Sequence, residues 1–167
     1  MNEMDIVSVR DDIERVIKEN IINRDLFFEV PKTKWENILD TVEEKFLDKK
    51  HYKQSLNWGW ELLFKEPVFT LRFLNDDGYK YLRDIIQEDR VWFIAEDHNG
   101  KMWIYDGRVD IIATLIGECY ELDEYYIVSK KYEWILCENH HRILIGSGSI
   151  SKNMKAFLGK NLEKLFL

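Results

Sequence analysis

Residues 1–167 predict a single α+β domain, built on a mostly antiparallel sheet of five or six strands that four or five helices cover. Helical periodicity occupies both ends of the chain, and short apolar or alternating runs dominate its second half. Asn99-Gly100 separates two of these runs, and Asn-Gly in such a place is the strongest short signal for a β-hairpin. A chain of 167 residues can bury enough apolar surface to fold without disulfides or metals.

Apolar residues spaced three and four apart predict the helices. Thr33 and Glu36 have the spacing of a capping box at the start of the second helix, and Asp76 or Asp77 can cap the third. The last helix has an apolar stripe of Met154, Phe157, Leu158, Leu162 and Leu165. The predicted helices are residues 5–20, 33–47, a third around 81–86, a short one around 109–116, and 151–166.

Strand patterns predict six segments, which are residues 68–73, 91–97, 101–106, 125–128, 132–136 and 142–145. The second and third pair as a hairpin across Asn99-Gly100, and the last three form a meander that continues the same sheet. Both faces of 132–136 carry large apolar groups, so we expect this strand to be central and covered on both sides. The last helix is the expected cover for one face, and the first two helices for the other.

The net charge of −7 and the absence of a dominant Lys/Arg cluster disfavour nucleic acid as a partner and favour basic proteins. The N-terminus lacks the basic and apolar regions of a signal peptide, and no apolar run approaches the length of a membrane span. Cys119 and Cys137 form no disulfide framework and are typical of reduced cytosolic thiols. We therefore expect a cytoplasmic protein that binds neither membrane nor nucleic acid.

The segment from Cys137 to His141 concentrates reactive side chains, because it also contains Glu138 and His140. Cys137, His140 and His141 are the residue types that bind zinc, and a Cys–His pair can also act as a nucleophile. Cys137 and Glu138 nevertheless point to opposite faces if both lie in a strand. A buried Cys beside a polar turn is the competing interpretation.

Two further clusters have both a functional and a structural interpretation. Glu96 and Asp97, beside the Asn-Gly turn, are candidate binding residues, and with Glu133 and Glu138 they could supply paired carboxylates for acid–base chemistry. The alternative is a solvated sheet edge. Residues 146–149 read Gly-Ser-Gly-Ser before a helix, which resembles an anion-binding turn but lacks the Lys and spacing of a P-loop.

Aromatic residues are unusually frequent at 14%, so we expect some to lie on the surface as anchors for a partner. The candidate anchors are Trp58, Trp60, Trp92 and Trp103. Trp58-Gly59-Trp60 would place both rings on one face of a strand, either closing the core edge or forming an exposed platform.

Residues 91–106, which read Val-Trp-Phe-Ile-Ala-Glu-Asp-His-Asn-Gly-Lys-Met-Trp-Ile-Tyr-Asp, resemble the central hairpin of the SUKH superfamily. Members of that superfamily have a strand that ends in a small residue and an acid, a Gly turn, and an aromatic strand that ends in Asp. The resemblance implies a bacterial immunity protein that binds and neutralises a cognate toxin. The chain departs from the family pattern because it lacks a proline-acid-tyrosine helix start followed by an Asn-Gly-Gly turn.

These observations favour a non-enzymatic acidic binding protein without a cofactor. Its partner would be a protein, and a basic toxin such as a nuclease fits the charge. One alternative is a small hydrolase or metalloprotein that uses Cys137, Glu138, His140 and His141. Another alternative is a structural or oligomerising domain.

Overall fold

A computed structural model describes residues 7–48 and 64–167. Its seven strands form one antiparallel sheet in the order β1-β4-β3-β5-β6-β7-β2. The strands are β1 (Phe27–Glu29), β2 (Val68–Arg72), β3 (Arg90–Glu96), β4 (Met102–Arg108), β5 (Tyr125–Val128), β6 (Trp134–Glu138) and β7 (Ile143–Gly148). The α+β class and the antiparallel sheet are confirmed, but the sheet has one strand more than the larger number predicted.

The described helices are α1 (Val9–Glu19), α2 (Lys32–Phe46), α3 (Leu82–Ile85), α4 (Val109–Glu118) and α5 (Ile150–Lys160), with 3₁₀ turns η1 (Gly78–Tyr81) and η2 (Leu162–Lys164). None of the helices in the described ranges is long and apolar enough to cross a bilayer. The second helix starts one residue before Thr33, after Pro31 as N-cap, and has no side-chain cap, so the predicted capping box is wrong. Pro31 suits this place because a helix start leaves backbone N–H groups without helical partners.

The predicted hairpin is confirmed, and β3 pairs with β4 from Arg90↔Arg108 to Glu96↔Met102. An Asn-Gly pair in a two-residue hairpin turn would have positive φ at both positions, but here only Gly100, with φ of 78°, is left-handed. The Gly100 N–H donates to the Asp97 carbonyl at 2.8 Å, and the Asp97 N–H donates to the Lys101 carbonyl at 2.8 Å. The chain therefore makes a longer turn with a glycine bulge, an alternative hairpin connection.

The predicted meander is also confirmed, and β5 joins it to β3 through pairs such as Phe93↔Ile127. Every residue of β6 is buried, so this strand is central and covered on both faces as expected. Two starts were placed too early, since Tyr132 has φ of 54° and Arg142 has φ of 60°. Both residues lie in turns, and the strands begin at Trp134 and Ile143.

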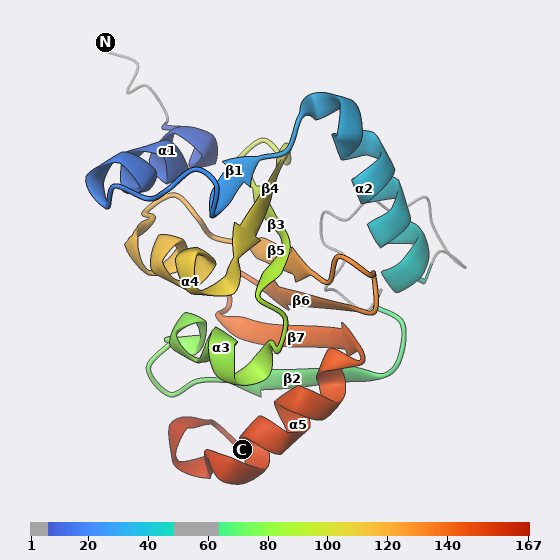
Figure 1. Cartoon of the computed structure of the whole chain (residues 1–167). Coiled ribbons are helices and arrows are strands. Elements are labelled where there is room, and N and C mark those ends of the chain that lie inside the picture. Colours follow the sequence, from blue (N-terminus) through green and yellow to red (C-terminus); the bar gives the residue numbers. More distant parts are fainter. Residues whose placement is uncertain (1–6, 49–63) are drawn as a thin grey trace.

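Two apolar clusters fill the two faces of the sheet. One joins the sheet to α1, α3, α4 and α5, and includes Val9, Ile13, Phe93, Leu136 and Met154. The other joins the sheet to α2, and includes Ile38, Val42, Ile94, Ile135 and Cys137. Figure 1 shows α1, α3 and α4 on one side of the sheet and α2 on the other.

The expectation that the first two helices cover the same face is therefore wrong. Val9, Ile13 and Val16 of α1 belong to the cluster on the face that α4 and α5 also cover, and α2 alone covers the second face among the described helices. The predicted final helix divides into α5 and η2. Its stripe is buried at Met154, Phe157 and Leu165, whereas Leu162 is 50% exposed.

Candidate functional site

An acidic pocket lies at one end of the sheet, where β3 ends, β5 begins and β6 ends. The strands are neighbours in the order β3-β5-β6, and Ala95↔Tyr125 and Tyr125↔Glu138 are paired, so the adjoining turns meet at this end. The pocket has a volume of about 400 Å³. Its lining consists of five carboxylates and two imidazoles, which are Glu96, Asp97, His98, Glu121, Asp123, Glu124 and His140.

Two histidine–carboxylate pairs connect the turns across the pocket. His140 Nδ1 lies 2.5 Å from Glu124 Oε1, and His98 Nε2 lies 3.0 Å from Glu121 Oε2. Glu124 is 8% exposed, so its carboxylate is the buried floor of the site, whereas both imidazoles reach solvent. Even with both histidines charged, the lining would carry a net negative charge, because five carboxylates face two imidazoles.

Asp97 has a structural role in the pocket wall. Its carboxylate accepts hydrogen bonds from the Trp103 indole at 3.0 Å, the His98 N–H at 2.9 Å and the Val9 N–H at 3.4 Å. Burial alone would raise the pKa of Asp97, but these hydrogen bonds outweigh it and hold the pKa below its ordinary value. Asp97 therefore stays charged and joins the hairpin to the start of α1.

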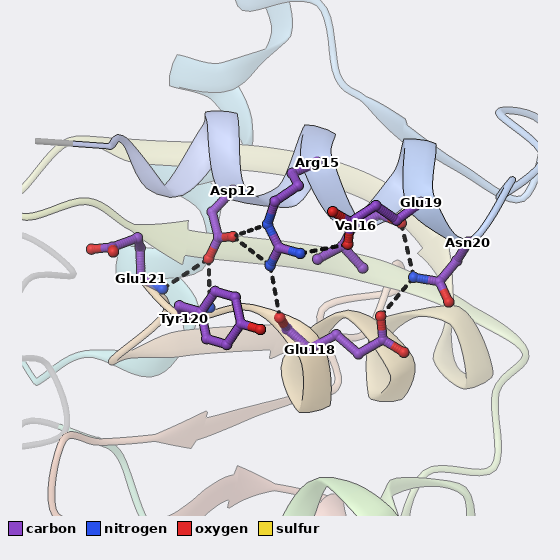
Figure 2. Close-up of polar contacts among 8 residues, drawn as sticks. All are labelled: Asp12, Arg15, Val16, Glu19, Asn20, Glu118, Tyr120 and Glu121. Atoms are coloured by element: carbon purple, nitrogen blue, oxygen red, sulfur yellow. Dashed lines mark hydrogen bonds and ion pairs between the residues drawn. The ribbon is translucent and has the colours of Figure 1, made fainter. Parts of the chain in front are cut away.

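A buried carboxylate on α1 fixes the loop that carries Glu121. Asp12 is 3% exposed, and its Oδ2 accepts the N–H groups of Tyr120 at 2.6 Å and Glu121 at 2.8 Å. Its Oδ1 accepts two bonds from Arg15, which also donates to the Glu118 carbonyl at 2.9 Å (Figure 2). Residues 118–121 are thus held to α1.

The family comparison covers the elements that build this pocket. A model described as a family of unknown function (DUF6756) matches residues 5–157. The chain belongs to this family. No curated protein and no solved structure matches the chain. The range that defines DUF6756 includes all seven described strands and every pocket residue, so the pocket lies within the family domain.

Of the predicted tryptophan anchors, Trp103 touches the wall of this site through its hydrogen bond to Asp97. Trp58 and Trp60 lie outside the described residues. Trp92 is half-buried against the α2 face, and Lys130 Nζ lies 4.5 Å from its ring centroid. Trp103 is half-buried against the α1 face, and its ring meets Trp35 edge-on at 5.5 Å. Trp92 and Trp103 therefore do not form one platform in this DUF6756 domain.

The reactive segment from Cys137 to His141 is divided between the core and the pocket. Cys137 is fully buried against the α2 face, and burial, together with the charges of Glu124 and Glu138, raises the pKa of its thiol well above the ordinary value. His140 faces the pocket and pairs with Glu124. Over residues 7–48 and 64–167, no group of three or more His, Cys, Asp and Glu side chains could hold a metal ion. Cys137 and His140 therefore lie in different surroundings, the first in the core and the second in the pocket.

Sequence reasoning nominated Glu96, Asp97 and His140, and allowed His98 as an additional metal ligand, but missed three carboxylates of the lining. These are Glu121, Asp123 and Glu124, and it also missed Asp12, which holds the loop of Glu121. A signal was present, because residues 118–124 contain four carboxylates in seven positions. The sequence pattern marks this segment only as a connection between a helix and a strand, so its carboxylates were not predicted to form a site.

A second, larger cavity of about 550 Å³ lies between α3 and α5. Its charged lining residues, Asp84, Lys160 and Lys164, have both signs, and Asp84 and Lys160 are exposed. The acidic pocket is the stronger candidate because its charges share one sign and include the buried Glu124.

Proposed function

We propose that this protein is a non-enzymatic binding protein that captures a basic segment of a partner protein in its acidic pocket. The observation that carries the proposal is the lining of five carboxylates and two imidazoles around about 400 Å³. Clustered charges of one sign in a concave surface concentrate the opposite charge and raise association rates. A Lys or Arg side chain is the protein group that fits such a site.

The nature of the partner follows from charge. A net charge of −7 repels phosphate polymers and attracts basic proteins. Residues 91–106, which resemble the SUKH hairpin, contribute Glu96, Asp97 and His98 to the pocket. This overlap supports the narrower proposal of a bacterial immunity protein that neutralises a basic toxin in the cytoplasm by direct contact.

A fluorescently labelled peptide of alternating arginine and glycine tests the pocket by anisotropy. We expect Glu121→Gln/Asp123→Asn to weaken binding about three- to tenfold, because each exposed ion pair contributes roughly 0.2–1 kcal/mol. The matched control is Glu36→Gln/Asp40→Asn, which removes the same charge from exposed positions of α2. The control should change affinity less than about twofold, since screening weakens distant charges.

The comparison between the two double variants decides the proposal. If both weaken binding equally, the peptide responds to net charge alone and the pocket is not the binding site. If the peptide binds the wild-type protein with no dependence on either pair, the acidic pocket has no role in capturing basic segments.

A further inference from the structure

We propose that the edge strand β2 is a second binding site, which accepts an extended segment of a partner protein as an additional antiparallel strand. This site is independent of the acidic pocket and of the function proposed for it. The sheet ends in β1 on one side and β2 on the other. β1 is only three residues long, whereas β2 has five, so β2 offers the longer edge for pairing.

The backbone of β2 has hydrogen-bonding groups that point away from the sheet. The Pro67 carbonyl accepts the Gly148 N–H at 3.1 Å. Hydrogen-bonded pairs recur at every second residue of an antiparallel ladder, so the backbone groups of Phe69 and Leu71 also point toward β7. Val68, Thr70 and Arg72 alternate with them and point outward. Thr70 therefore presents both its N–H and its C=O at the outer edge, and no hydrogen bond from either group occurs within the described residues.

The chain's own C-terminal segment already pairs with one end of this edge. Phe73 and Leu165 form an antiparallel bridge, the Phe166 N–H donates to the Arg72 carbonyl at 2.9 Å, and the Leu74 N–H donates to the Lys164 carbonyl at 2.9 Å. No further pairing of this edge occurs among residues 7–48 and 64–167, which leaves Thr70 and the Val68 carbonyl open there. An incoming antiparallel strand would continue the pairing that the tail begins.

A cavity beside the open edge defines the side chains that the segment should carry. It has a volume of about 530 Å³ and a largely apolar lining of Leu71, Ile143, Leu158, Phe166 and Leu167, with Thr70 and Arg72. A partner residue opposite Phe69 points to the same face of the sheet as Leu71, which is the α5 face where Leu158 lies, so an aliphatic side chain fits there. Arg72 makes no ion pair within the described residues, so an acidic residue opposite Thr70 complements it.

A second copy of the chain fits this edge less well than a partner segment. Symmetric pairing of two β2 strands about Thr70 would place Val68 of the copy opposite Arg72. The Phe166 backbone already occupies that place, and its ring lies 5.0 Å from the Arg72 guanidinium. A single extended segment can instead end opposite Thr70 and avoid the tail.

A phage-displayed library of random peptides of about seven residues, selected on the full chain, tests the proposal. We expect the selected peptides to alternate aliphatic and acidic or β-branched residues. Thr70→Pro removes the outward N–H, and should weaken their binding at least about tenfold. Thr70→Val keeps the N–H and is the matched control, with affinity within about twofold of wild type. Bound peptide should slow hydrogen exchange of the Thr70 amide at least about tenfold.

Circular dichroism checks that Thr70→Pro is folded, and if it is not, Leu158→Asp, which places a charge in the cavity, replaces it with the same expected loss. The proposal is overturned if no peptide is selected, if the selected peptides bind the variant and the wild type alike, or if the Thr70 amide exchanges unchanged. A wild-type dimer that the Thr70→Pro variant abolishes in sedimentation would assign the edge to a second copy, and would also overturn it.

Discussion

Removing the Asp12 carboxylate should both destabilise the protein and loosen one wall of the acidic pocket. Asp12 does not line the pocket, but it holds the backbone N–H groups of Tyr120 and Glu121 at 2.6 and 2.8 Å. In Asp12→Ala both N–H groups lose their acceptor, and Arg15 loses a charged partner at 2.8 Å (Figure 2). The loop that carries Glu121 is then free to move away from α1.

The size of the effect follows from the two amide groups. An unsatisfied buried donor costs about 1–3 kcal/mol, and the lower half of that range applies because these bonds are only partly buried. Two donors then give a loss of about 2–4 kcal/mol in the free energy of unfolding. For a domain of this size each kcal/mol shifts Tm by about 2–4 °C, so we expect a decrease of roughly 5–15 °C.

Differential scanning calorimetry measures the stability, and the arginine–glycine peptide measures the pocket. The matched control is Glu19→Gln, which removes an exposed ion pair from the same Arg15 at 2.6 Å and should leave Tm within about 2 °C of wild type. A decrease below about 2 °C for Asp12→Ala would mean that water satisfies both amides and that the carboxylate does not anchor the loop. If Asp12→Ala lowers Tm but leaves the peptide affinity unchanged, the Asp12 carboxylate stabilises the fold without shaping the pocket.

The remaining predictions concern pH and backbone geometry. Burial raises the pKa of Glu138, so the folded state favours the protonated form and loses stability as pH rises from about 4. Urea unfolding should show Glu138→Gln matching or exceeding wild-type stability at pH 7, with the difference shrinking toward pH 4; a difference between variant and wild type that stays constant over this range contradicts the assignment. Gly148, with φ of 86°, faces a backbone carbonyl, so Gly148→Ala should cost about 2 kcal/mol or more, whereas Gly159→Ala on open α5 should gain about 0.5–1 kcal/mol. Equal unfolding midpoints for the two variants would refute this reasoning.

The sheet could be predicted where local pattern and pairing agree. The β3–β4 hairpin and the β5–β6–β7 meander follow from period-two alternation separated by polar turns. The errors at Tyr132 and Arg142 arose because a non-glycine residue with positive φ gives no signal of its own in the sequence. Both look like strand residues from their neighbours, and only the turn hydrogen bonds exclude them.

The seventh strand depends on tertiary contacts. β1 has only three residues, and no alternating run marks it. Phe27 pairs with Gly107, whose missing side chain leaves room for the Phe27 ring, and that ring stacks on Tyr105 with centroids 4.8 Å apart. The partner strand therefore creates β1, which local propensity could not predict.

The position of α1 has the same kind of cause. Its apolar stripe could have covered either face of the sheet, because periodicity specifies a buried side but not the surface against which it packs. Polar contacts distinguish the faces: Asp12 bonds to the loop after α4, and the Asp97 carboxylate accepts the first N–H of α1. These partners are 88 and 108 residues away in sequence, beyond any local pattern.

The acidic pocket could be predicted only in fragments, because strand order assembles it. Glu96 ends β3, Glu124 precedes β5 and His140 follows β6, so the three lie in segments that are separate in the sequence. They meet because β5 is inserted between β3 and β6, with antiparallel pairing on both sides. Residues that are neighbours in the sequence are instead separated. The side chain of Cys137 in β6 points into the core, whereas His140 in the following turn contacts Glu124. Proximity along the chain therefore suggested a Cys–His pair, whereas strand order brings His140 to the Glu124 carboxylate.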